Sequence, residues 1–470
     1  MEKILYNVKS MRTPLVITFL VCISLCTYAQ NTNTGGVSAP AVVQDSSKLN
    51  LALPVTVKDT GKNSINQYLT LKQCIDYAMV HQPALNIAMI NVDVAKTTNA
   101  INLSGWLPQV NASGDLIHNI KLSNNAQNAY VNTFIPGITA SQTIFNPSLL
   151  YAYKSAPLYV KQAQQVTDST KIFLVSFVTK SFYNVLLTLE QINVLKEDTT
   201  RLGKSLRDAY HQYKGGIVDE TDYEQADITL NNSKAQLKQA NENVIPQYAS
   251  LKRLMGYRAE QQFNVSFDTL EMMQSIHIDT NQQLQYEKRI EYLQNKTSKD
   301  IQNEFVNYYR FSFLPTVSAF YDYNLAFENN RLSDLMSTSY PNSLVGVSFS
   351  IPIFTGFARI HNLHKAKLQE QILDWNTNDL KLQIYSEYTS ALANYKGNYY
   401  NLQLLQKNVA LAKRVYFVVT LQYKQGIVPY LNVITAESNL ITSEISYLNA
   451  LFQVLSNKVD LQKAMGNITY

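Results

Sequence analysis

The sequence predicts a mainly α-helical fold with a membrane β-barrel, built from a duplicated unit of helix, β-hairpin and long coiled-coil helix. Three observations predict it: an internal repeat over most of the chain, four stretches with apolar residues at every second position, and two very long stretches almost free of helix breakers. The 470 residues include only 15 Gly and 13 Pro. Only 16% are charged and the net charge is +5, which is too balanced to indicate a nucleic-acid partner.

Residues 1–29 have the pattern of a secretory signal peptide. Lys3, Lys9 and Arg12 precede the apolar stretch 15–26, and the small Ala29 ends the segment. This stretch is too short to cross a bilayer, which needs roughly 20 apolar residues. The sequence therefore predicts an exported protein whose signal peptide is removed.

The cysteines agree with this prediction. Cys22 and Cys26 leave with the signal peptide, so the mature chain keeps Cys74 and has no disulfide framework. A lipid-modified Cys26 is disfavoured, because Leu25 stands where lipoprotein signals place a small residue. Residues 30–66 are polar and without a clear period, which predicts a mobile lead-in.

The remaining chain contains one unit twice. The matching pairs, separated by 207 to 210 residues, are Leu107-Pro108 with Leu314-Pro315, Ile144-Phe145 with Ile353-Phe354, Tyr213–Val218 with Tyr423–Val428, and Leu254–Gly256 with Ala464–Gly466. Four matches in the same order predict a first repeat over 67–256 and a second over 284–470. The less periodic segment 257–283 is expected to connect them and to wrap the middle of the helices.

Each repeat contains two predicted strands. The expected ranges are 108–121 and 134–146 in the first repeat, and 315–328 and 344–354 in the second. In the last range, Val345, Val347, Phe349, Ile351 and Ile353 alternate with small or polar residues. Strands of this length cross a membrane when tilted, but the alternation also suits an ordinary antiparallel sheet with one wet face.

The long helical stretches favour the membrane interpretation. From Phe357 to Lys424 there is one Gly and no Pro, and apolar residues recur at alternating spacings of three and four, as in a coiled coil. At about 1.5 Å per residue this helix would extend roughly 100 Å, about three times a bilayer core, and it is too polar to lie in lipid. Four strands cannot close a membrane barrel, since single-chain bacterial barrels start at eight, so several chains would have to associate.

From Leu69 to Gly466 the chain resembles the TolC-type outer-membrane factor family. The specific marks are the two Leu-Pro pairs that enter the strands and the segments Tyr213…Gly216…Ala226 and Tyr423…Gly426…Ala436. The resemblance implies a homotrimer in outer-membrane lipid, with one twelve-stranded barrel on a helical periplasmic tunnel. It also implies a periplasmic adaptor and an inner-membrane transporter as partners, within a tripartite efflux or type I secretion system that passes small toxic molecules or secreted cargo outward.

The resemblance assigns Tyr213, Gly216, Tyr423 and Gly426 to tips that face the adaptor. Physically, a Gly after a Lys ends a helix well, because Gly adopts the left-handed conformation cheaply and Lys suits a helix C-terminus. Both turns would serve equally as plain helix caps. Duplication of Tyr and Lys along with Gly favours a surface that also contacts a partner.

The resemblance also directs attention to the periplasmic entrance. Family members often carry aspartates six and nine residues after the second Gly, where this chain has Asn432 and Thr435. An acidic ring of that kind is therefore absent. Asp219, Glu220 and Asp222 of the first repeat either supply an acidic entrance or form a solvated cluster at a helix start, and both interpretations stay open.

The other motifs give little information about function. His361 and His364 lie one helical turn apart without a third ligand, so a surface or tunnel-lining pair is the expectation rather than a metal site. Tyr321 and Tyr323 suit an aromatic belt at a membrane surface. We expect no enzymatic activity, no catalytic or metal site and no cofactor. The alternative function is that of an exported structural coiled-coil protein with a soluble β-hairpin module.

Overall fold

The computed structural model describes residues 68–120, 130–266, 272 and 275–470. The chain divides into two units, and the described residues belong to the second, Ser64–Tyr470. The predicted signal peptide and the predicted lead-in, 1–29 and 30–66, lie outside the described residues.

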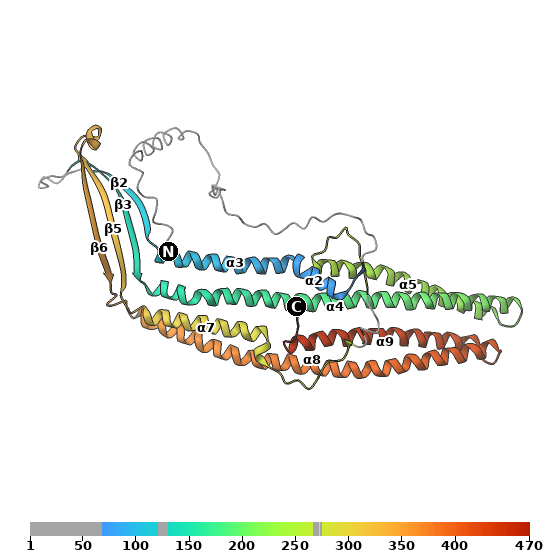
Figure 1. The fold of residues 1–470 in the computed structure, drawn as a ribbon. Helices are drawn as coiled ribbons and strands as arrows, with labels where there is room; N and C mark the ends of the chain where they lie inside the picture. The colour runs from blue at the N-terminus through green and yellow to red at the C-terminus, as the bar shows by residue number, and fades with distance from the viewer. Residues whose placement is uncertain (1–67, 121–129, 267–271, 273–274) are drawn as a thin grey trace, which may run out of the picture. The chain divides into compact units, whose positions relative to one another are not determined.

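The duplicated order of elements is visible along the chain (Figure 1). The first copy consists of α2 (Leu71–His81), α3 (Pro83–Leu103), β2 (Gln109–His118), β3 (Asn132–Phe145), α4 (Pro147–Lys214) and α5 (Glu220–Met255). The second consists of α7 (Ile290–Phe311), β5 (Thr316–Asn329), β6 (Ser339–Ser350), α8 (Ala358–Lys424) and α9 (Tyr430–Ala464). Short 3₁₀ helices are Ser104–Trp106, Tyr286–Lys288 and Leu332–Ser337, and β1 (Tyr68–Leu69) pairs with β4 (Asn264–Val265). The predicted fold class is confirmed.

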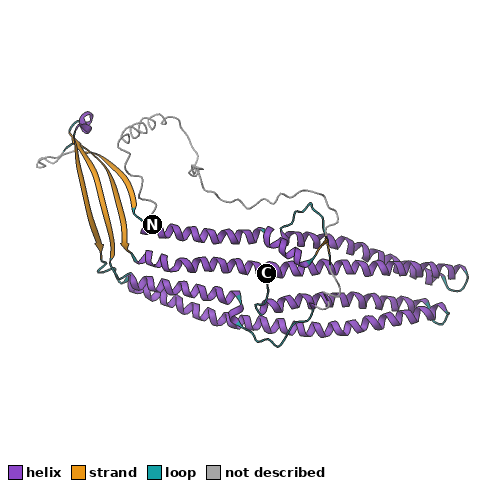
Figure 2. Cartoon of the chain, in the orientation of Figure 1, coloured by secondary structure: helices purple, strands orange, loops and turns teal. Residues whose placement is uncertain are grey.

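The four longer strands form one antiparallel sheet in the order β2-β3-β5-β6 (Figure 2). The central pairing of β3 with β5 joins the two repeats, for example through Phe134 opposite Phe327. β6 begins at Ser339, five residues before the expected start, because its ladder with β5 continues to Phe327 although alternation of apolar residues does not mark that part. In the described part of the chain, β2 and β6 each pair with a strand on one side only, so this sheet has two open edges.

The faces of the sheet follow the alternation. Val347 lies opposite Ala319, and Val345 lies opposite Tyr321, so these side chains share one apolar face. On the other face lie Ser348 and Gly346, and the Phe320 ring covers the space where Gly346 has no side chain. In the single chain, Val345 and Val347 are exposed on this apolar face.

The long helices form two antiparallel hairpins, α4 with α5 and α8 with α9 (Figure 1). α4 starts at an Asn146-Pro147 pair: Asn146 accepts a hydrogen bond from the Ser148 N–H, and Pro is favoured at the first helical position. The predicted seam of α8 faces α9 of the same chain, where Tyr395 and Leu402 are buried in one cluster with α9 side chains. One stretch of α4 is long and apolar enough to cross a membrane, but half of it is buried inside the structure, which fits a helix of the bundle.

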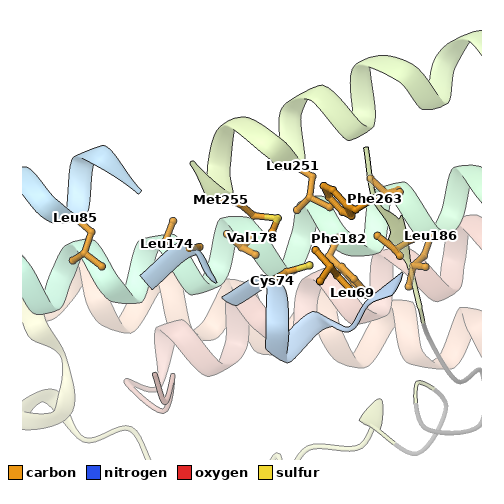
Figure 3. Packing of buried hydrophobic residues seen from close by; sticks show 13 residues of the cluster. Leu69, Cys74, Leu85, Leu174, Val178, Phe182, Leu186, Leu251, Met255 and Phe263 are labelled. Atoms are coloured by element: carbon orange, nitrogen blue, oxygen red, sulfur yellow. The ribbon is translucent and has the colours of Figure 1, made fainter. Parts of the chain in front are cut away.

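A second core lies where α2, α4 and α5 meet (Figure 3). Phe182 and Val178 of α4 pack with Leu251 of α5 and with the fully buried Cys74 of α2. Burial raises the pKa of the Cys74 thiol to about 12. This thiol is therefore protonated and acts as a small apolar side chain.

The connecting segment, described in part, contacts the second hairpin. The Ile276 carbonyl accepts a hydrogen bond from the Tyr395 hydroxyl at 2.9 Å, and the Gln282 carbonyl accepts one from the Tyr388 hydroxyl at 3.0 Å. These bonds attach the segment to the middle of α8. That it wraps the bundle there stays a prediction.

The repeated Met-Gly pair has a structural reason. Gly256 ends α5 in the left-handed conformation, and a Cβ there would lie 2.5 Å from the His81 carbonyl oxygen. Gly466 after α9 has the same conformation, and a Cβ there would lie 2.6 Å from the Lys288 carbonyl oxygen. In both repeats, the helix end therefore touches the backbone of an earlier segment.

We expect Gly256→Ala to lower the thermal unfolding temperature. The left-handed backbone alone costs a non-Gly residue about 1–2 kcal/mol, and the clash with His81 adds to it. Circular dichroism of the purified protein measures the shift. Gly203→Ala is the control, because nothing lies within 4 Å of a Cβ there; an equal loss in both variants would contradict the close approach.

Candidate functional site

The ends of the two hairpins carry the same backbone turn. Gly216 and Gly426 have φ angles of 69° and 70°. The Gly216 N–H donates to the Tyr213 carbonyl and the Gly426 N–H to the Tyr423 carbonyl, each at 2.9 Å. In both turns the next residue, an Ile, donates to the carbonyl of the residue before the Tyr. The duplicated motif therefore builds one helix-ending turn twice.

The tyrosines of the two turns differ in their surroundings. Tyr423 is only 9% exposed, and its hydroxyl donates to Gln212 Oε1 of the first hairpin at 2.6 Å. Its ring packs beside Tyr430, and burial raises the pKa of Tyr423 to about 12. Tyr213 is half-buried and stacks on Tyr223 at 6.2 Å. The duplication thus predicts the backbone of both turns but not the same role for both side chains.

The exposed surface of each tip follows from this difference. On the first hairpin, the Lys214 ammonium lies 5.6 Å from the Tyr210 ring and 5.5 Å from the Tyr213 ring. On the second, Lys424, Gln425 and Ile427 are exposed, while Tyr423 joins the hairpins. That the tips face an adaptor stays a prediction. The exposed groups of the tips are the strongest candidates for contact with an adaptor, because the Tyr423 hydroxyl is bonded to Gln212 inside the chain.

The acidic residues of the first tip lie together at the start of α5. Asp219 precedes the helix and Glu220 begins it, and both are exposed. Asp222 is half-buried, and desolvation, followed by repulsion from Asp219, raises its pKa. Asn432 and Thr435 are exposed in the first two turns of α9. Among the described residues of the tips, these three acidic groups therefore lie on the first hairpin, and whether they form an acidic entrance stays a prediction.

Sequence reasoning missed a polar cluster farther up the hairpins. Tyr430 donates or accepts a hydrogen bond with Ser205 at 2.9 Å, and beyond it Asp198 and Arg201 of α4 approach Glu437 of α9. A signal was available: Asp198 and Glu437 occupy positions of apolar rows, between Leu195 and Leu202 and between Val433 and Leu440. Charged residues in such rows indicate a buried polar contact.

The remaining candidates are surface groups. His361 and His364 are exposed on α8. In the described ranges, no group of three or more His, Cys, Asp or Glu side chains is placed to hold a metal ion. Tyr321 and Tyr323 are partly exposed on the apolar face of the sheet. A belt position for these two tyrosines stays a prediction.

Comparison with known proteins identifies similar proteins over most of the chain. The family model described as outer membrane efflux protein matches residues 74–257 and 300–467. The outer membrane protein TolC of Vibrio cholerae serotype O1 is 19% identical over 405 residues, covering 85% of this chain and 91% of that protein. The cation efflux system protein CusC of Escherichia coli strain K12 is 22% identical over 414 residues, covering 84% of this chain and 86% of that protein. The crystal structure of the outer membrane protein VceC from Vibrio cholerae has a TM-score of 0.70 at 16% identity, covering 84% of this chain and 96% of that chain.

Proposed function

Since this chain belongs to the outer membrane efflux protein family, we propose that three copies of it close into one channel that passes cargo from a periplasmic transport assembly to the outside. Its place is the outer membrane and its function is efflux. The observation that supports association of several copies is a four-stranded sheet with one apolar exposed face and, among the described residues, two open edges; the number three comes from the family resemblance. In lipid, such edges must pair, because unpaired backbone groups have no water to bond there.

The helices pack side by side in the same order as the strands. In the described chain, the two outermost helices of this row each have a neighbour on one side. α3 packs on α4, α4 on α7, and α7 on α8, which parallels β2-β3-β5-β6. The outer helices expose apolar side chains, among them Ile90 and Val94 on α3 and Ile372 and Trp375 on α8. A ring in which α8 and β6 of one chain meet α3 and β2 of the next would cover both edges at once. Such a head-to-tail contact closes by rotation.

The proposal also includes the partner at the hairpin ends and the way in which the cargo passes. The hairpin ends, with Gly216 and Gly426, would dock a periplasmic adaptor that joins the channel to an inner-membrane transporter. The cargo would be small toxic molecules or secreted protein, which cross a water-filled tunnel without forming a bond to it. We therefore propose that the chain catalyses no reaction and uses no cofactor.

The experiment combines fractionation, native mass and conductance. The mature chain, extracted from outer membranes, should have the native mass of three chains and should form discrete conducting pores in planar bilayers. A matched variant with Ile372→Glu and Trp375→Glu, on the exposed face of α8, should be recovered as monomers without conductance. Recovery of the unmodified chain as a soluble periplasmic monomer would overturn the proposal in favour of a structural coiled-coil protein.

A further inference from the structure

Two buried carboxylates face each other across the contact between the hairpins. Asp198 of α4 and Glu437 of α9 are each 1% exposed. Glu437 lies seven residues after the start of α9, roughly 10 Å along the helix from the tip. A charged side chain in such a place is stable only when paired and hydrogen-bonded.

One guanidinium serves both carboxylates. Arg201 Nη2 lies 3.4 Å from Asp198 Oδ1, and Arg201 Nε lies 3.5 Å from Glu437 Oε1. Asp198 also accepts a hydrogen bond of 2.6 Å from Ser233 of α5. The Glu437 carboxylate has no comparably short hydrogen bond in the described structure, although Arg201 and the Tyr416 hydroxyl face it. Asp198 is therefore the better satisfied partner, and Glu437 is the weaker one.

Among the described groups that act on Glu437, Arg201 is the cation. Tyr416 of α8 and Tyr430 of α9 face it, and burial raises the pKa of both hydroxyls, which keeps them neutral. Glu444 lies two helical turns farther along α9, and its Oε1 atom forms an ion pair with Lys413 Nζ at 3.1 Å. Glu197 lies 3.9 Å from Arg201 and adds further negative charge. When both buried carboxylates are ionised, the cluster therefore carries excess negative charge.

The titration of Glu437 follows from this geometry. Burial, followed by repulsion from Asp198, raises the pKa of Glu437 to about 7, although Arg201 and the Tyr416 hydroxyl oppose the rise. Burial also raises the pKa of Asp198. Both carboxylates thus favour the protonated form more strongly than exposed carboxylates do.

We propose that Asp198, Arg201 and Glu437 form a proton-operated latch, which holds the α8–α9 hairpin against the α4–α5 hairpin when Glu437 carries a proton and loosens this contact when it does not. Protonated Glu437 leaves Asp198 and Arg201 as a balanced pair. Ionised Glu437 competes with Asp198 for one cation in a buried site. The latch lies between α4 of the first repeat and α9 of the second, near the ends of both hairpins. Its release would therefore let the two tips separate.

The sign of the pH dependence is fixed by the two states. When the hairpins separate, Glu437 meets water and returns to its ordinary value of 4.5, whereas in the packed state its pKa is about 7. The packed state therefore holds its proton longer, and packing is strongest below pH 4.5. Between these two values the packing equilibrium should weaken roughly tenfold for each pH unit, and above pH 7 it should change no further.

Pulsed electron paramagnetic resonance tests the latch in the assembled full-length mature protein. Nitroxide labels at Lys204→Cys and Ser438→Cys, both exposed positions beside the cluster, report the distance between the hairpins. Cys74 stays unlabelled because it is buried. Labelled chains are diluted with unlabelled ones, so that distances within one chain dominate. We expect one short distance at about pH 4.5 and a growing longer population up to about pH 7.

Two variants and one control decide the outcome. Glu437→Gln should keep the short distance at every pH. Asp198→Asn should reduce the total pH-dependent weakening by about tenfold or more, because the like charge beside Glu437 is gone. Glu444→Gln, the same change on the same helix, should behave as the unmodified protein.

A Glu437→Gln variant with the unmodified pH response would overturn the latch, as would a distance that never changes in the unmodified protein. If Glu437→Gln does not assemble, the Asp198→Asn series decides by the same measure. The distance measurement does not require export or an adaptor. Failure of the latch would therefore leave the proposed channel function untouched.

Discussion

Val347→Arg should prevent most of the protein from assembling in the outer membrane. Val347 lies in β6 on the apolar face of the sheet, and it is 53% exposed in the single chain. An Arg on the lipid face near the middle of a bilayer costs about 2–4 kcal/mol, and a ring of three chains would carry this cost three times. The measurement is the amount of assembled oligomer in purified outer membranes, separated on gels without heating.

Ser348→Arg is the matched control for this prediction. Ser348 follows Val347 directly and points to the opposite face, beside Ser318 of β5. A new Arg there would meet the water-filled side of the barrel. We expect near-normal assembly and a changed conductance or ion preference in planar bilayers. Equal assembly defects in the two variants would contradict the assignment of the faces.

Gly426→Val should abolish export while leaving the assembled barrel in place. The φ angle of 70° at Gly426 is one that a β-branched residue resists, and the left-handed conformation costs about 1–2 kcal/mol. Nothing lies within 4 Å of a Cβ at this position, so the backbone conformation alone is disturbed. α8, with its 67 residues, separates the turn from β6 by roughly 100 Å. We therefore expect normal oligomers, lost export and reduced cross-linking to the adaptor.

Gly426→Asn separates backbone strain from side-chain bulk. Asn tolerates the left-handed conformation, so this variant should export nearly as well as the unmodified protein. Gly216→Val should act in the same direction but less strongly, because Tyr423, next to the second turn, connects the hairpins through Gln212. Normal export by both Val variants would identify the glycines as replaceable caps, and loss of the oligomer would place the turns in assembly.

The proton-operated latch adds a condition to the docking prediction. Docking on the tips and protonation at Glu437 act on the same pair of hairpins, whose contact includes Tyr423 and Gln212 near the tips and Arg201 farther up. A partner that separates the tips would therefore bind more readily where Glu437 is ionised. Reciprocally, its binding should lower the pKa of Glu437.

Much of the architecture could be predicted from the sequence, because it depends on local signals. The alternation of Val345, Val347 and Phe349 identifies a strand with one apolar face, and the glycines after Lys214 and Lys424 identify two helix ends. The internal repeat sets the order of elements twice. The strand and helix-end signals act within a few residues, where periodicity and backbone preference decide the conformation.

The tertiary structure decided what the two copies do differently. Tyr213 and Tyr423 occupy equivalent places in the repeat, yet only Tyr423 is buried, because the Gln212 side chain comes to it from the first hairpin and the Tyr430 ring packs on it from α9 of its own hairpin. Likewise, Asp198 and Glu437 are 239 residues apart, and neither sequence neighbourhood contains the other. Such burial depends on which helix faces another, and contacts between distant segments determine that arrangement. The sequence by itself determined the elements and their repetition, and only the packing of one hairpin on the other decided which of its polar side chains are enclosed.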